Sequence, residues 1–245
     1  MVAKKKTVFV LGAGSSADYG YPIGKDLREK IIDLKSDGNL FEAFVSTDDF
    51  DELSMGVDPD LSRGHIERFS NDNPFFNLAD RFMRSGKSSI DEFLLTNDDL
   101  MPIGKFSIAQ LLLKNEVENN LMRFGWSQLL WSRLTKGKRA SGEVNHDFGF
   151  VTFNYDTSLE YIISQNIRST FRAEGERAVT SFFEEIPVFH VHGKIKTFPW
   201  EGSGGGNYSK NGFQQFENKE IIRMSRGIRL FHETDEDEVL EGLKN

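Results

Sequence analysis

The sequence contains no cysteine, and it has no apolar run of the length that a membrane-spanning helix needs. Without cysteine the chain forms no disulfide, has no cysteine nucleophile and offers no thiolate ligand to zinc. A membrane span takes about 20 apolar residues, and the apolar run near the N-terminus is too short for a signal peptide. We therefore expect a cytoplasmic protein with no membrane partner.

The sequence also has fewer basic residues than acidic ones. Lys and Arg number 30 against 38 Asp and Glu, which gives a net charge of −8. A nucleic-acid binder needs a basic face for phosphates, so we expect no direct contact with nucleic acid. The hydrophobic fraction of 38% is too high for a disordered chain. We interpret residues 1–245 as a single domain with a large core.

Three short apolar segments predict buried β-strands, at residues 7–12, 148–154 and 187–195. Residues 227–231 are a candidate for a fourth strand. Because these segments alternate with helical patterns, the strands are expected to lie parallel. The predicted fold class is α/β, with a Rossmann-like parallel sheet and helices on both faces.

Helical patterns occupy most of the remaining chain. Apolar residues repeat at helical spacing after Pro22, and residues 37–146 are interpreted as a large, mostly helical insertion. Residues 7–36 and 147–245 then form the Rossmann-like part. Further helices are predicted at residues 157–167, at 218–227 and from 234 onward. The sequence ends on a helix where a doubly wound domain would run into another strand, so we expect a fragment of a longer protein.

A glycine turn follows the first predicted strand. Residues 12–17, Gly-Ala-Gly-Ser-Ser-Ala, fit the pattern G-x-G-x-x-A between a strand and a helix. Glycines let the backbone approach a phosphate closely, and the N–H groups at a helix start favour the anion. The alternative is a tight connection with no ligand. A dehydrogenase would place a second strand and an acidic residue about 20 residues on, but Asp33 falls inside the predicted helix, which disfavours that class.

Polar side chains follow the other two strands. Asn154 and Asp156 come after the second strand, and His190 and His192 belong to the third. Because the carboxyl ends of parallel strands share the ligand-binding edge, we expect these side chains beside the glycine turn. An amide, a carboxylate and an imidazole together are typical of a catalytic site.

Each of these residues also has a purely structural interpretation. Asn154 and Asp156 are suitable caps for the helix that follows them, and either histidine is a candidate for a hydrogen-bonded core residue. His190 and His192 alternate along the predicted strand and are expected on the same face. Such a pair offers two ligands to a metal, but no third ligand stands at a supporting spacing, so no metal is predicted.

The ordered set of three segments resembles the sirtuin (silent information regulator two) superfamily. The matching segments are GAGSSADYGYP, TFNYD and HVHG, with a helical insert between the first two. The four-cysteine zinc module of protein-deacylating sirtuins is missing. In this respect, and in the segment SIDEFL at residues 89–94, the sequence is similar to the sirtuin-like domains of bacterial anti-phage systems, such as Thoeris effectors.

The resemblance implies an NAD hydrolase. Domains of that branch cleave the nicotinamide N-glycosidic bond, which yields nicotinamide and ADP-ribose or a cyclic form, and NAD is their substrate rather than a recycled cofactor. Asn154 and His192 are the implied catalytic residues, with His192 as general base. The implied NAD-binding residues are Gly12, Ala13, Gly14, Ser15, Ser16, Pro22, Ile23, Tyr155 and Asp156. The implied partners are a homo-oligomer or a larger defence complex.

Two other functions stay open on the sequence. A module that binds NAD or ADP-ribose without turnover would use the same glycine turn, although it would need neither Asn154 nor His192. A deacylase without the zinc module would need a groove for acylated lysine, and no segment of the sequence identifies one.

Overall fold

The computed structural model describes residues 7–36, 73–144, 146–186, 188–201 and 216–234. The protein is mixed α/β, mostly helical, and contains one small parallel sheet. It divides into two compact units, each assembled from distant parts of the sequence. The first unit comprises residues 1–21, 116–214 and 233–245, and the second comprises residues 22–115 and 215–232. These boundaries differ from the predicted ones at residues 37 and 146.

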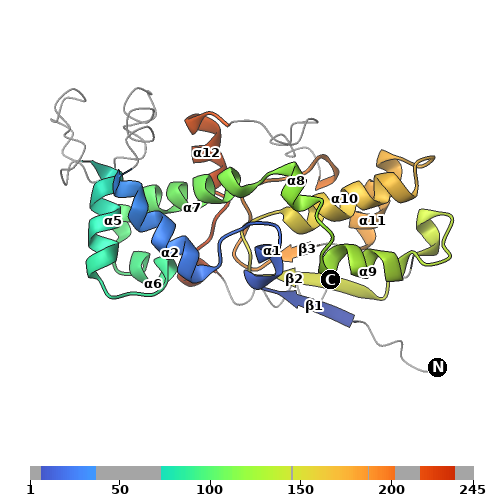
Figure 1. Cartoon of the computed structure of the whole chain (residues 1–245), viewed down its shortest axis with the longest axis horizontal. Helices are drawn as coiled ribbons and strands as arrows, with labels where there is room; N and C mark the ends of the chain where they lie inside the picture. Colours follow the sequence, from blue (N-terminus) through green and yellow to red (C-terminus); the bar gives the residue numbers. More distant parts are fainter. Residues whose placement is uncertain (1–6, 37–72, 145, 187, 202–215, 235–245) are drawn as a thin grey trace. The chain divides into compact units, whose positions relative to one another are not determined.

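The first unit contains the sheet. Its strands are β1 (Thr7–Leu11), β2 (Phe148–Thr152) and β3 (Val188–His190), which run parallel in the order β1-β2-β3 (Figure 1). Phe9 pairs with Phe150, and Phe150 in turn pairs with Val188. All three strands are rich in β-branched and aromatic residues, which favour extended backbone. The prediction of three parallel strands is confirmed.

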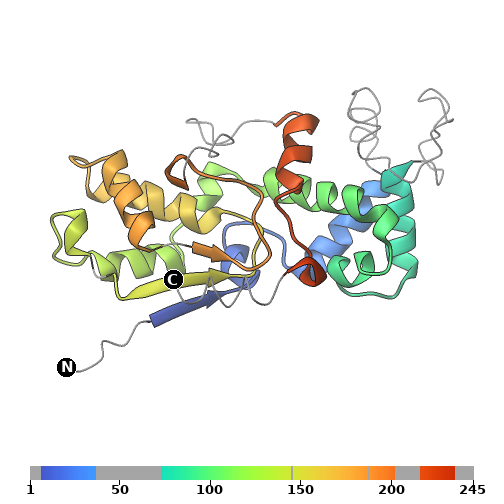
Figure 2. The same ribbon diagram turned by 180° about the vertical axis from the view of Figure 1, so that it is seen from behind.

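One face of the sheet packs against three helices: α9 (Trp126–Leu134), α10 (Ser158–Thr170) and α11 (Glu176–Glu185). Alternate strand residues, including Phe9, Phe148 and Phe150, join buried side chains of these helices in one apolar core. Figure 2 shows α10 and α11 on the same side of the sheet. The opposite face of β1 carries Val8 and Val10, which are 53% and 67% exposed.

Shorter elements complete the first unit. They are α1 (Gly14–Ala17), α8 (Glu118–Leu121) and the 3-10 turns η4 (Ser141–Glu143) and η5 (Pro199–Glu201). The segment after α1 is tied to the start of α9 by Tyr19, which is 1% exposed. Its hydroxyl lies 2.6 Å from Ser127 Oγ and donates to Gln128 Oε1 at 3.2 Å. These hydrogen bonds connect the segment that follows the glycine turn to α9, which lies more than 100 residues further along the chain.

Gly125 allows this close approach, and its replacement by Ala is expected to destabilise the protein by about 1–3 kcal/mol. A Cβ at Gly125 would lie 2.8 Å from the Tyr19 hydroxyl oxygen and 3.2 Å from the ring carbon that carries it. The matched control is Gly142→Ala, where a Cβ meets no described atom within 4 Å. Chemical denaturation of both variants checks the prediction, and equal stabilities would contradict it.

The second unit is a cluster of helices around α7 (Met101–Asn115). Residues on every side of α7 are buried, and α7 contacts α2 (Gly24–Asp33), α5 (Pro74–Arg84), α6 (Ile90–Leu94) and α12 (Asn218–Ser225). A helix that is apolar around its whole circumference belongs in a core. The 3-10 turn η1 (Leu34–Ser36) contacts α2 and α5, and η3 (Asp98–Leu100) contacts α7. A further 3-10 turn, η6 (Phe231–Glu233), contains the boundary in sequence between the two units.

The starts of two of these helices follow directly from the sequence. Asn73 precedes Pro74, and its Oδ1 accepts hydrogen bonds from the backbone N–H groups of Phe75 and Phe76. Ser89 Oγ accepts from the N–H of Asp91 at the start of α6. Side-chain oxygens at these positions satisfy N–H groups that the helix itself leaves unpaired.

Several sequence-based expectations need correction. The third strand ends at His190 rather than at residue 195, and residues 227–231 form a turn with one isolated bridge instead of a strand. Within the described residues, the helices α9 to α11 cover one sheet face, while Val8 and Val10 on the other face stay largely exposed. Helix α11 was not predicted. The helix predicted from residue 234 onward lies, apart from Thr234 itself, outside the described residues.

Candidate functional site

The glycine turn leads directly from β1 into α1. The Ser15 N–H donates to Gly12 O at 2.8 Å, and the Ser15 hydroxyl donates to the same oxygen at 2.7 Å. Trp126 Nε1 donates to Ser15 O at 2.8 Å, so the first residue of α9 is bonded to the turn. Gly12, Ala13 and Gly14 are exposed. The outer side of the turn is therefore open to a ligand.

Neither Gly12 nor Gly14 is required by the described fold. Their φ angles lie outside the left-handed region, and an added Cβ would meet no described atom within 4 Å at either position. Glycine is otherwise retained where another group approaches the backbone closely. The open space beside both residues is consistent with a ligand that contacts this backbone.

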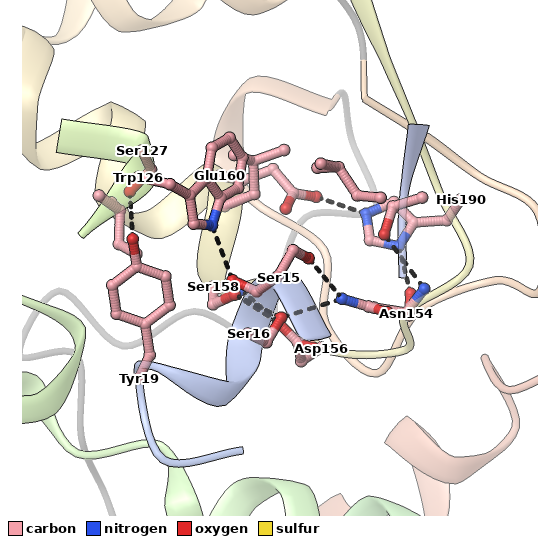
Figure 3. Close-up of a pocket in the computed structure, with 14 residues that line it drawn as sticks. Ser15, Ser16, Tyr19, Trp126, Ser127, Asn154, Asp156, Ser158, Glu160 and His190 are labelled. Atoms are coloured by element: carbon pink, nitrogen blue, oxygen red, sulfur yellow. Dashed lines mark hydrogen bonds and ion pairs between the residues drawn. The ribbon is translucent and has the colours of Figure 1, made fainter. Parts of the chain in front are cut away.

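Asn154 joins the end of β2 to the glycine turn (Figure 3). Its side-chain nitrogen donates to Gly12 O at 3.1 Å, to Ser15 Oγ at 3.2 Å and to Ser16 Oγ at 2.9 Å. Asn154 is 9% exposed. The side chain thus fixes the turn and its two serine hydroxyls, a role that adds to the one expected from the sequence.

Asp156 forms the second link between these segments. Its Oδ1 accepts hydrogen bonds from Ser16 Oγ at 3.1 Å and from the backbone N–H of Ser158 at 3.1 Å, and it also accepts from the Ser158 hydroxyl. The N-cap position of α10 is Thr157, so Asp156 is not the cap residue that the structural interpretation expected, but its bond satisfies the N–H of Ser158, the first residue of the helix. Asp156 is 7% exposed, and burial raises its pKa although the two serines oppose that shift.

A small cavity with both polar and apolar lining lies next to the turn. Its lining includes Ser16, Asn154, Asp156, Glu160 and His190. The free space at its centre is about 10 Å³, which suits a single water molecule. The cavity is far too small for a nucleotide, so a dinucleotide would lie on the exposed side of the turn.

The two histidines have different environments. His190 is 7% exposed, with Nδ1 2.9 Å from Asn154 O and Nε2 2.8 Å from Glu160 Oε1. His192 is half-buried, its Nδ1 lies 3.0 Å from Thr234 Oγ1, and its ring lies beside Phe153 at 5.6 Å between centroids. The prediction that they share one face was wrong because β3 ends at His190, so strand alternation does not reach His192.

A sharp turn follows His192. Gly193 has a φ of 67°, a left-handed conformation that favours glycine, and its N–H donates to His190 O at 3.2 Å. The His192 ring lies near the rings of Phe153 and Tyr155, and His192 is not among the residues that line the cavity. Phe153 and Tyr155 flank Asn154 in the sequence.

The remaining predicted site residues are Tyr155, Pro22 and Ile23. Tyr155 is half-buried, with its ring centroid 6.3 Å from that of His192. Pro22 and Ile23 belong to the second unit, where Ile23 immediately precedes α2 and is 41% exposed. Within the first unit, the structure therefore brings together Gly12, Ser15, Ser16, Asn154 and Asp156, with His192 near the residues that flank Asn154.

A buried group of charged side chains adjoins this cluster. Glu116 pairs with Lys196, and Glu160 pairs with His190 at 2.8 Å and lies 3.6 Å from Lys194 Nζ. Burial raises the pKa of Glu116 despite Lys196. Burial also acts to raise the pKa of Glu160, but His190 and Lys194 outweigh it and lower that pKa. Buried groups with shifted pKa values gather at functional sites.

Tyr21 belongs to the same group. It is 4% exposed, and burial raises its pKa well above the ordinary value, with further contributions from Glu116, Asp156 and Glu160. Of this group, Tyr21, Glu116 and Glu160 were not predicted as site residues, whereas Asp156 was. The sequence did contain one indication of this group. Glu160 lies within an apolar stretch beside Leu159, and a charged residue buried in such a stretch requires a buried partner.

Replacement of Asp156 with Asn is expected to raise the free energy of unfolding at pH 8. Because the pKa of Asp156 is raised in the folded protein, its stabilising contribution exists at low pH and is lost as the pH rises through that pKa. Asn removes the buried charge and keeps an oxygen acceptor for Ser16 and Ser158. Denaturation from pH 4 to pH 8 should show an advantage of the variant that grows with pH, and a variant less stable at pH 8 would contradict the assignment.

Comparisons with known proteins give no assignment. No family model matches the chain, and neither a curated protein nor a solved structure matches it. Among the described residues, no three His, Asp or Glu side chains gather in a way that could hold a metal ion. The helices formed by those residues are all too short or too polar to cross a membrane.

Proposed function

We propose that the protein is an NAD hydrolase that cleaves the nicotinamide N-glycosidic bond, with a Rossmann-like nucleotide site at the glycine turn. The observation that carries the proposal is the network in which Asn154 and Asp156, after β2, hold the serines of an exposed glycine turn after β1. Such edges of parallel sheets are where nucleotides bind. Consumption of NAD is also the activity of the anti-phage branch that the sequence resembles.

The chemistry needs a group that accepts one proton. As the glycosidic C–N bond breaks, its electron pair stays on the nicotinamide nitrogen, which loses its positive charge. The oxygen of a water molecule bonds to the ribose carbon, whose transition state resembles an oxocarbenium ion, and the water gives up a proton. The products are nicotinamide and ADP-ribose, and a cyclic form results when a ring nitrogen of the adenine replaces the water.

His192 is the better candidate for the base. Both ring nitrogens of His190 are already bonded, to Asn154 O and to Glu160 Oε1. The ring of His192 lies beside those of Phe153 and Tyr155, which flank Asn154, and its Nδ1 lies 3.0 Å from Thr234 Oγ1. His192 is also the base that the resemblance implies, and histidine is the side chain whose ordinary pKa suits proton transfer near neutral pH.

The glycine turn would bind the pyrophosphate, and Gly14→Ala is expected to weaken NAD binding about 10-fold or more, which corresponds to about 1.4 kcal/mol. The added methyl group meets no described atom within 4 Å, so the fold should tolerate it. Gly142→Ala, with equally open surroundings, is the matched control. Calorimetric titration with NAD checks the prediction, which unchanged affinity in a folded Gly14→Ala protein would contradict.

Incubation of the purified protein with NAD, with and without an acetyl-lysine peptide, tests the proposed activity. Chromatography of the products separates the candidate functions. Nicotinamide and ADP-ribose formed without peptide support hydrolysis, whereas turnover that requires the peptide indicates a deacylase. Saturable NAD binding without any product indicates a binding module, which is the second candidate because the exposed glycine turn alone would serve it.

A further inference from the structure

His190 is held at both ring nitrogens by groups from different elements. Its Nδ1 lies 2.9 Å from the backbone oxygen of Asn154, and its Nε2 lies 2.8 Å from Glu160 Oε1 on α10. A carbonyl oxygen only accepts hydrogen bonds, so the hydrogen of the first bond must reside on Nδ1. The position of that proton is therefore fixed by the fold.

The second bond joins two buried side chains. His190 and Glu160 are 4% and 1% exposed, and Lys194 Nζ lies 3.6 Å from the same oxygen of Glu160. Burial acts to raise the pKa of Glu160, but His190 and Lys194 outweigh it and lower that pKa. Both ring nitrogens of His190 are thus engaged, one by the backbone of Asn154, which follows β2, and one by Glu160 on α10.

Such a buried pair needs an explanation beyond stability. Well-packed apolar residues in place of a buried ion pair are often neutral or stabilising. Here His190 is hydrogen-bonded to the backbone oxygen of Asn154. The side-chain nitrogen of Asn154 in turn donates to Gly12 O and to the hydroxyl oxygens of Ser15 and Ser16 (Figure 3). A continuous chain of hydrogen bonds therefore runs from α10 through β3 to the glycine turn.

We propose that the buried His190–Glu160 pair is a clamp that fixes Asn154 against the glycine turn, which makes His190 a positioning residue and not the base of the reaction. This inference rests on the proposed function for its kinetic consequence. Its structural content, a His190 that donates from Nδ1 to Asn154 O, is independent of any activity.

Two substitutions of His190 separate positioning from mere packing. In His190→Asn the side-chain nitrogen can still donate to Asn154 O, whereas His190→Leu fills the space without a donor. We expect His190→Leu to lower kcat for NAD hydrolysis about 10–100-fold, as loss of an outer partner of a functional group does. His190→Asn should recover most of that loss and keep the wild-type pH profile, because the base is His192.

Nitrogen-15 NMR of histidine-labelled protein tests the clamp without NAD. In the wild type, Nδ1 of His190 should carry a hydrogen, because Asn154 O can only accept a hydrogen bond. A neutral wild-type His190 with an unprotonated Nδ1 would overturn the proposal, as would a folded His190→Asn protein no more active than His190→Leu.

The two proposals fail in different ways. If the wild type releases no nicotinamide, the proposed hydrolysis fails, and the clamp is then judged by NAD affinity. It is supported if His190→Leu weakens NAD binding and His190→Asn restores it, and it is overturned if both variants bind NAD as the wild type does.

Discussion

Replacing His192 with Ala is expected to lower the rate of nicotinamide release about 10²–10⁴-fold, the usual contribution of a general base. The affinity for NAD should change little, because a general base acts on the attacking water in the transition state and adds little to the binding of the substrate. Product chromatography gives the rate, and calorimetric titration gives the affinity. Asn154→Ala should also abolish turnover, but with weaker NAD binding, since the glycine turn loses its anchor.

The matched control for His192 is His146→Ala. His146 belongs to the same unit and pairs with Glu185, while its ring packs against Phe182 in the core on the helical side of the sheet. Its loss should leave nicotinamide release unchanged. Full activity in a folded His192→Ala protein, or an equal loss in both histidine variants, would remove His192 from the mechanism.

Lys196→Met is expected to destabilise the protein by about 3–5 kcal/mol. Lys196 and Glu116 form an ion pair whose side chains are 3% and 6% exposed. Removal of the lysine leaves a buried carboxylate whose pKa is already raised by burial. Glu116 must then either stay charged without its partner or take up a proton, and both alternatives cost stability.

A double variant shows whether Lys196→Met loses stability through the unpaired charge of Glu116 or through poorer packing. Glu116→Leu combined with Lys196→Met leaves no unpaired charge in the interior, and we expect it to recover most of the stability lost in Lys196→Met. Urea denaturation of the wild type, the single variants and the double variant gives the coupling. If the double variant loses the sum of the two single losses, the buried pair is not the cause.

The parts of the fold that depend on local pattern could be predicted from the sequence. Residues 7–11 and 148–152 form strands because their apolar, β-branched and aromatic side chains suit extended backbone and burial. The glycine turn lies between β1 and α1 where the glycine pattern indicated it. Asn73 and Ser89 begin helices through side-chain bonds that are local in sequence.

The parts that depend on long-range pairing could not be predicted. Glu160 and His190 are 30 residues apart, and Glu116 and Lys196 are 80 apart, so no spacing rule links them. The third strand ends early at His190, which gives the two neighbouring histidines different surroundings. Strand alternation is a sound rule only where the strand continues.

A time course of NAD with the wild-type protein, followed by proton NMR, tests the central claim most directly. The account predicts that nicotinamide and ADP-ribose, or its cyclic form, appear in equal amounts as NAD disappears, and that the same sample of Asn154→Ala leaves NAD intact. NAD that remains whole in a solution where the wild-type protein demonstrably binds it would contradict the account, as would cleavage at the pyrophosphate in place of the glycosidic bond.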